Sequence, residues 1–176
     1  MAGDQPPLYR ASVPVLIAVL DRIAAELGAA QAQLGPELEA ALEQRPAPGM
    51  MPAARQVATA IQFTLRIAHP LAGRRAPELR GPLDAAGLIA RTGTAQRHIA
   101  ALPPKAFVGA ETRIVRAQAG LAHLELPGEA YLHEFGLPNL YFHQAMAHVA
   151  LKQAGVVIGK EDFDGKHQYP QGYSLG

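Results

Sequence analysis

The residues best suited to chemistry in this chain are its seven histidines, because it contains no cysteine. Asn139 and His143 are four positions apart in a segment with helical spacing, so their side chains are neighbours on a helix surface. An amide and an imidazole so placed can hydrogen-bond a polar ligand, and imidazole also binds divalent metals or transfers protons. We therefore predict that this pair forms the polar floor of a small-molecule pocket.

Other polar side chains are candidates for the walls of the same pocket. Tyr141 lies between the two residues of the pair. Arg55 and Gln62 belong to a polar stripe at helical spacing, which Thr59 and Arg66 complete. This stripe is either a solvated helix face or one side of a cleft opposite the pair.

A second pair, Glu129 and His133, is also separated by four positions. A carboxylate beside an imidazole can orient the ring for acid–base catalysis. The same pair near a helix N-terminus is also an ordinary surface interaction. His133 is kept as a ligand-binding candidate. The histidines expected at the surface are His98, His123, His148 and His167.

Composition argues against several classes of function. The absence of cysteine removes thiol catalysis, disulfides and thiolate metal sites. The two serines, Ser12 and Ser174, do not suit a serine triad. A formal charge of +1 gives no reason to expect binding to nucleic acid or to an acidic membrane. The apolar run 13–20 is too short to cross a membrane and no basic secretory region precedes it, so a cytoplasmic protein is expected.

The last long helix would position the Asn139–His143 pair. Pro138 fits the first turn of a helix, because proline has no amide hydrogen. We predict helical turns over 128–135, a break at Gly136-Leu137 and a helix over 138–153. At about 100° per residue, the pair borders an inward face formed by Phe142, Met146, Val149 and Ala150. The opposite face carries Tyr141, Gln144, His148 and Lys152.

Three long helices and one short helix are predicted before this region. Ser12 is a candidate N-cap for the first, in which Glu26 faces water. A short helix over 36–43 and a second long helix over 52–68 follow. The third long helix, over 83–101, has an inner stripe of Leu88, Thr92, Ala95 and Ile99.

The remaining segments are predicted as a hairpin, a loop and a tail. Residues 112–116 and 121–126 alternate in polarity as the strands of a β-hairpin do. The loop 69–82 is basic and expected to be solvated. Residues 1–164 are predicted to form a single domain, followed by a mobile C-terminal tail over 165–176.

Three blocks of sequence carry a family resemblance. The run HEFGLPNLYFHQAMAHVALKQAGVVIGKEDF resembles the signature of the bacterial family called domain of unknown function nineteen ninety-three. The block APGMMPAARQV resembles that family's entry to its second helix, and YRASVPV resembles its opening. The family is placed in the DinB/YfiT-like superfamily. The resemblance implies a mainly α protein, a DinB-like four-helix bundle with a short β-hairpin between helices three and four.

The resemblance also bears on metal binding. Proteins of the superfamily commonly hold a divalent metal with three histidines, one from the second helix and two spaced four apart on the last. The matching pair here is Asn139 and His143, and the nearest mid-helix polar residue of the second helix is Gln62. Because an amide replaces imidazole poorly at zinc or nickel, no cofactor is expected. A weaker divalent-metal site that uses His143 is kept as an alternative.

Three functions are compatible with these observations. The first is a bundle protein that binds a small molecule near His143 without a complete three-histidine metal site. The second is a metal-dependent hydrolase or transferase that uses His143 as ligand or base. The third is a structural module that forms a homodimer through its long helices. The missing histidines favour the first.

Overall fold

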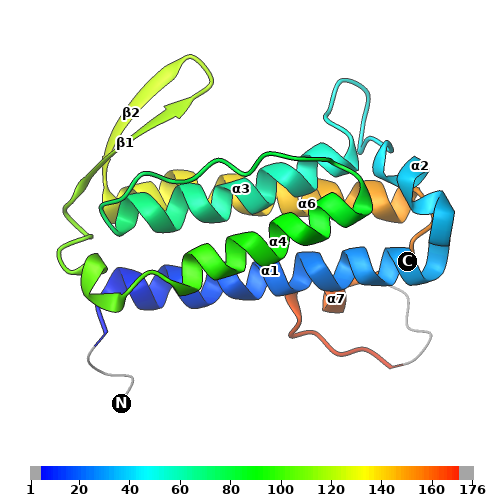
Figure 1. Cartoon of the computed structure of the whole chain (residues 1–176), viewed down its shortest axis with the longest axis horizontal. Helices are drawn as coiled ribbons and strands as arrows, with labels where there is room; N and C mark the ends of the chain where they lie inside the picture. Colours follow the sequence, from blue (N-terminus) through cyan, green and yellow to red (C-terminus); the bar gives the residue numbers. More distant parts are fainter. Residues whose placement is uncertain (1–4, 171–176) are drawn as a thin grey trace.

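The computed structural model describes residues 5–170, and its helices form a bundle (Figure 1). The four long helices are α1 (Pro7–Leu34), α3 (Ala53–Leu71), α4 (Ala85–Ala100) and α6 (Leu137–Gln153). Helix α3 packs along both α4 and α6, while α1 packs mainly against α4 and α3. The predicted mainly α bundle with a small hairpin is confirmed.

Helix α1 begins six residues earlier than the sequence suggested, with Pro6 rather than Ser12 as its N-cap residue. Ser12 is buried inside it, and its hydroxyl donates a hydrogen bond of 2.5 Å to the Leu8 carbonyl oxygen. Its prediction as an N-cap was therefore wrong. The helix starts at Pro7, which occupies the first position, where a missing amide hydrogen costs nothing.

The core is built from the apolar faces of the long helices. The stripe predicted for α4, formed by Leu88, Thr92, Ala95 and Ile99, is buried along its whole length. Leu16 and Leu20 of α1 and Leu65 of α3 are also fully buried. Burying each such leucine contributes about 1.5–3 kcal/mol to folding. The period of the apolar residues is thus enough to fix the inner faces of α1 and α4.

Short helical segments close the two ends of the bundle. The 3-10 turn η1 (Gly35–Glu37) and helix α2 (Leu38–Leu42) follow α1. At the other end, the 3-10 turn η2 (Pro104–Phe107) buries Phe107, whose ring meets Tyr9 edge to face with centroids 5.2 Å apart. These contacts hold the ends of α1 in place.

A two-stranded antiparallel hairpin stands at one end of the bundle (Figure 1). Strands β1 (Ile114–Ala119) and β2 (Ala122–Pro127) pair with Val115 opposite Leu126. Gly120 makes the turn with a positive φ of 60°, which glycine adopts without steric cost. The predicted hairpin is confirmed, with both strands lying slightly further toward the C-terminus than expected.

The chain enters α6 without the predicted break. Helix α5 (Gly128–Ala130) continues into a π-helical segment, η3 (Tyr131–Gly136), and η3 continues directly into α6. A Cβ on Gly136 would lie only 2.8 Å from Cγ1 of Ile67 in α3. The glycine therefore permits close packing against α3 and does not end a helix.

The C-terminal part of the described chain returns to α1. Helix α7 (Lys160–Asp164) lies against α1 (Figure 1). Part of the predicted tail, residues 171–176, lies outside the described residues. Within the described chain, every helix is too short or too polar to cross a membrane.

Candidate functional site

His143 is held by a buried amide on the neighbouring helix. Nδ1 of His143 lies 2.7 Å from Oε1 of Gln56, and Gln56 is only 1% exposed. The amide nitrogen of Gln56 donates to the Met51 carbonyl oxygen at 3.3 Å, so its oxygen faces the ring. Because that oxygen only accepts hydrogen bonds, the network assigns the proton of neutral His143 to Nδ1. Nε2 keeps its lone pair for a proton, a ligand or a metal.

Aromatic rings and one arginine surround this imidazole. Phe63 stacks on His143 with centroids 5.6 Å apart, and Phe142 meets it edge to face at 5.2 Å. The guanidinium carbon of Arg66 lies 4.6 Å from the centre of the Phe63 ring. Burial, and after it the positive charge of Arg66, lowers the pKa of His143 below its ordinary value. The ring is therefore neutral at neutral pH and suited to act as a base or hydrogen-bond acceptor.

The other candidates on and near α6 have different neighbours. The Asn139 amide donates a hydrogen bond of 2.7 Å to the Phe135 carbonyl oxygen, and within residues 5–170 no hydrogen bond joins it to His143. Tyr141 is 40% exposed, and burial of the rest of the side chain raises its pKa. His133 is exposed on η3. The structure thus joins His143 to α3, while Asn139 binds the backbone of its own helix.

The predicted inward face of α6 was wrong. Phe142 is half exposed, whereas Gln144, which the sequence placed opposite, is buried with Leu140 and Ala147. The physical reason is that apolar residues lie on every side of α6, so the helix has almost no amphipathic direction. Packing against α3 and α1 selects the buried side instead.

His148 belongs to a second polar cluster, between α6 and α1. Its Nδ1 lies 2.7 Å from the Glu26 carboxylate, and the two side chains are 13% and 4% exposed. The prediction that His148 points to the surface and that Glu26 faces water was wrong for both. Burying an unpaired charge costs free energy. Here His148 and Glu26 pair with each other between α6 and α1.

Helix α7 closes this second cluster. The Phe163 ring meets the His148 ring edge to face at 5.7 Å. The Gln144 amide nitrogen donates to the Phe163 carbonyl oxygen at 3.1 Å, while its buried oxygen has no partner within the described residues. The cluster therefore joins α1, α6 and α7 through polar contacts that are shielded from water.

Gln62 and Arg55 lie on a different side of α3. The Gln62 amide donates to the Pro77 carbonyl oxygen at 2.8 Å and accepts from the Leu79 amide at 3.0 Å. Arg91 of α4 donates to the carbonyl oxygens of Leu79 and Gly81. Gln62 thus holds the extended segment between α3 and α4 in place, and Arg55, Thr59 and Gln62 of the polar stripe line a cleft together with that segment.

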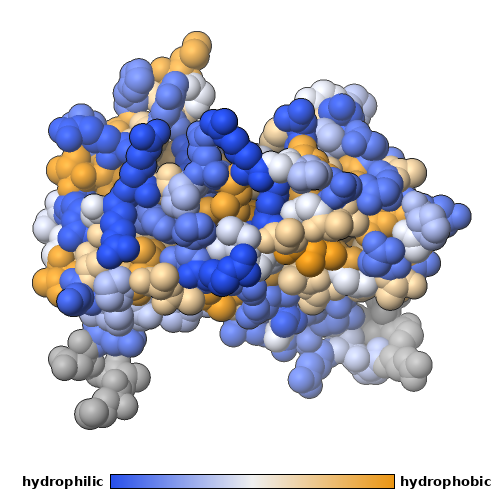
Figure 2. Space-filling view, in the orientation of Figure 1, coloured by the Kyte–Doolittle hydropathy of each residue, from blue (hydrophilic) through white to orange (hydrophobic). Residues whose placement is uncertain are grey.

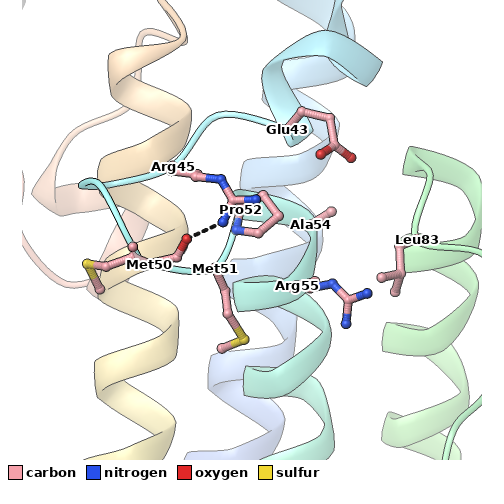
Figure 3. A pocket seen from close by; sticks show the side chains of 9 residues that line it. Glu43, Arg45, Met50, Met51, Pro52, Ala54, Arg55 and Leu83 are labelled. Carbon is pink, nitrogen blue, oxygen red and sulfur yellow. Dashed lines mark hydrogen bonds between the residues drawn. The ribbon is translucent and has the colours of Figure 1, made fainter.

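Two adjoining clefts open where α3 begins. One, of about 420 Å³, is lined by Arg55 and Gln62 of α3, by residues of the α3–α4 segment and by Arg91. The other, of about 370 Å³, shares Met51, Arg55 and Leu83 with the first. Figure 3 shows Arg55 reaching from α3 toward Leu83 in the second cleft. Asn139, Tyr141 and His143 line neither cleft.

The residues present do not fit the three-histidine metal centre of the superfamily. Asn139 stands at one histidine position with its amide donating to backbone, so of this pair only His143, through Nε2, could ligate a metal. Within residues 5–170, no three His, Cys, Asp or Glu side chains are grouped to hold a metal ion. The histidines that would complete such a centre beside His143 are thus missing from the described part of the chain.

Sequence reasoning missed Gln56 and Glu26, although helical spacing points to both. Gln56 lies four residues before Ala60, the stripe continues at spacings of three and four with Phe63 and Ile67, and all four residues are buried. Glu26 falls in the same way between Ile23 and Ala30 on the buried side of α1. A polar residue on an apolar stripe is the signal of a buried polar contact.

Comparisons with known proteins agree with the fold. The family model described as Domain of unknown function (DUF1993) matches residues 8–164. The crystal structure of a DinB family member protein from Shewanella denitrificans is similar over 93% of this chain and 94% of that chain, with 25% identity and a TM-score of 0.82. No curated protein matches the chain. The resemblance found in the sequence is confirmed, and the chain belongs to the family of domain of unknown function DUF1993.

Proposed function

We propose that this protein binds a small organic molecule and that its ligand lies in the paired clefts at the start of α3, here called the α3 groove. The observation that carries this proposal is the position of Arg55 at the junction of the two clefts. Its guanidinium is exposed and has no hydrogen-bond or ion-pair partner within residues 5–170. A free cation in a concave site favours a ligand with an acidic or strongly accepting group.

One part of the α3 groove suits the apolar part of such a ligand, while the rest of its lining also carries charged side chains, among them Glu43. Met51 and Leu83 line both clefts and are only partly buried. The segment that forms one wall is tied down by Gln62 and Arg91, so the shape of the groove is present before a ligand arrives. A wall already ordered reduces the entropic cost of binding.

A naphthalene sulfonate dye tests this proposal, because it combines an anionic group with an aromatic body. Its fluorescence is titrated against the wild type and Arg55→Ala. We expect Arg55→Ala to weaken binding about tenfold, the effect of losing one charge-assisted hydrogen bond. Leu83→Asp should weaken binding by a similar factor, because it adds a negative charge to the same wall.

The matched control is Arg97→Ala, on exposed α4 surface outside both clefts. Arg97→Ala should keep wild-type affinity. Equal affinity for the dye in all three variants would mean that the dye binds elsewhere, and the proposal would fail. Circular dichroism checks that each variant remains folded.

A second candidate is an enzyme in which His143 is the base. It is favoured by the neutral imidazole whose free Nε2 is held in one orientation by Gln56. A hydrolase screen with activated esters tests it, using His143→Gln as the comparison. Activity that survives in His143→Gln would exclude this role.

A further inference from the structure

A third cleft, lined by arginines, lies between the end of α3 and strand β1. Its volume is about 620 Å³, and it is named the arginine cleft. Its lining contains no aspartate or glutamate, and the arginines in it are Arg66, Arg74, Arg75, Arg113 and Arg116. These are five of the 16 Lys and Arg residues of a chain whose formal charge is only +1. The positive charge is therefore local and does not reflect a basic protein.

Most of this charge is not neutralised by the protein. Arg113 donates to the carbonyl oxygens of Leu71, Ala106 and Val108, and Arg66 donates to the Gln118 carbonyl oxygen. A carbonyl oxygen satisfies a donor without cancelling its charge. Of these five arginines, only Arg116 forms an ion pair with a carboxylate of the described residues, that of Glu125, and the pair is exposed.

Arg74 and Arg75 are the two guanidinium groups left free. Both are exposed, and neither has a hydrogen-bond or ion-pair partner within residues 5–170. Figure 2 shows long hydrophilic side chains on the face below the hairpin, along the segment that follows α3. If the loop 69–82 were only a solvated basic loop, there would be no reason for the charges of Arg74 and Arg75 to border a cleft.

The turn that carries them is well defined. Gly73 has a positive φ of 68°, and its amide donates to the Pro70 carbonyl oxygen at 2.9 Å. The Arg74 amide donates to the His69 carbonyl oxygen at 2.8 Å. These bonds end α3, and the two arginines that follow Gly73 line the arginine cleft together with residues of β1. The cations are thus presented by an ordered backbone.

The size and walls of the arginine cleft indicate the kind of anion. A bare inorganic ion would leave most of about 620 Å³ empty. Ile114 and Ala117 of β1 form an accessible apolar part of the cleft wall, whereas Tyr131 is only 1% exposed and its hydroxyl donates to the Arg66 carbonyl oxygen. Several guanidinium groups together match the charge and tetrahedral oxygens of a phosphate dianion.

We propose that the arginine cleft binds a phosphorylated small molecule, with Arg74 and Arg75 on the phosphate group and the organic part against Ile114 and Ala117 of β1. This site is separate from the α3 groove and does not depend on the function proposed for it. Gathering like charges costs folding free energy, and a bound phosphate relieves that cost. Binding should therefore also raise the melting temperature.

Isothermal titration calorimetry with adenosine monophosphate tests the proposal, with adenosine and succinate as comparison ligands. We expect the monophosphate to bind and adenosine and succinate to bind at least about tenfold more weakly, because each lacks the phosphate. The double variant Arg74→Ala/Arg75→Ala should weaken monophosphate binding about tenfold or more. Both side chains are exposed and unpaired, so this variant should fold.

A charge-matched control separates a specific site from general attraction. Arg10→Ala/Arg97→Ala also removes two exposed positive charges, but neither residue lines the arginine cleft. It should keep its affinity for the monophosphate within about twofold. An equal loss in both double variants would overturn the proposal. So would equal binding of adenosine or succinate, or no binding of the monophosphate to the wild type.

Discussion

Two histidines of α6 meet opposite sides of the bundle and have different surroundings. His143 and His148 are five positions apart, which turns them away from each other on the helix. Each is held through Nδ1 at 2.7 Å by a buried side chain of another long helix. The partner of His143 is the neutral amide Gln56, and that of His148 is the carboxylate Glu26.

The comparison indicates that the role of a histidine on α6 depends on the side chain it contacts on the neighbouring helix. Gln56 orients His143 without adding charge and leaves a half-buried imidazole near the surface. Glu26 instead needs His148, because a buried carboxylate without a partner is costly. His143 thus keeps a ring nitrogen, Nε2, without a partner among the described residues, whereas His148 neutralises a buried carboxylate and is expected to contribute to stability.

The largest effect should come from His148→Ala. The variant leaves the Glu26 carboxylate buried and unpaired, so we expect the free energy of unfolding to fall by about 3 kcal/mol. Urea unfolding followed by circular dichroism measures it. His98→Ala, on the exposed surface of α4, should change it by less than about 0.5 kcal/mol. Similar losses in the two variants would show that the buried pair contributes nothing.

An apolar replacement of the whole pair sharpens this test. In Glu26→Met/His148→Leu no charge is left buried, so most of the stability lost in His148→Ala should return. Unfolding in urea is again the measurement. A double variant no more stable than His148→Ala would point to packing, rather than the carboxylate, as the cause of the loss.

The fold was more predictable from sequence than these partners were. The spacing of Leu88, Thr92, Ala95 and Ile99 fixes the buried side of α4, because the rest of that helix is polar enough to face water. Helix α6 offers no such contrast, since Phe142 and Leu140 are both apolar and only one is buried. Which one is buried depends on how α6 packs against α3 and α1, and the local sequence of α6 does not carry that information.

The two buried partners show the same limit. Periodicity can place Gln56 and Glu26 on inner faces, but it cannot say which residue of α6 each will meet. That choice depends on the axial position of α6 relative to α3 and α1. The close contact of Gly136 with Ile67 helps to set this position. The candidate pair Asn139 and His143 was chosen from helical adjacency alone, and Asn139 bonds the Phe135 carbonyl oxygen.

The second largest effect is expected from Gln56→Leu. Losing the hydrogen bond to His143 should lower the free energy of unfolding by about 1–2 kcal/mol. This loss is smaller than in His148→Ala because no buried charge is left unpaired. Nitrogen NMR of the imidazole should show the Nδ1-protonated form in the wild type and a mixture of tautomers in the variant. Gln168→Leu, at an exposed position, is the control for both measurements. An unchanged tautomer in Gln56→Leu would contradict the assigned network.

The next effect is expected in the pH dependence of the free energy of unfolding, to which His143 should contribute. Burial and Arg66 lower its pKa in the folded state, so the unfolded chain takes up the proton first as the pH falls below the ordinary value of 6.5. The contribution of His143 is thus fully present above that pH and is lost as the pH falls through the folded-state pKa. In His143→Gln, the free energy of unfolding should fall less between about pH 7 and pH 5.

The variant Arg66→Gln should have an intermediate effect on the same pH dependence. It removes the positive charge near the ring but leaves the imidazole in place, so the pKa of His143 should rise part of the way toward its ordinary value. The pH dependence should lie between those of the wild type and His143→Gln. A wild-type profile in Arg66→Gln would mean that burial alone lowers the pKa.

The smallest effect on stability should come from Phe142→Ala, which nevertheless tests why His143 is neutral. Phe142 is half exposed, so its removal should cost less than about 1 kcal/mol. Its ring covers an edge of the imidazole, with centroids 5.2 Å apart, and burial is the main cause of the lowered pKa. Proton NMR titration should therefore show the pKa of His143 rising in Phe142→Ala with little change in unfolding. Tyr141→Ala, which removes a neighbouring exposed ring, should leave that pKa lower than Phe142→Ala does. If the two variants raise it equally, Phe63 and Gln56 must provide the burial, and His143 depends on α3 alone.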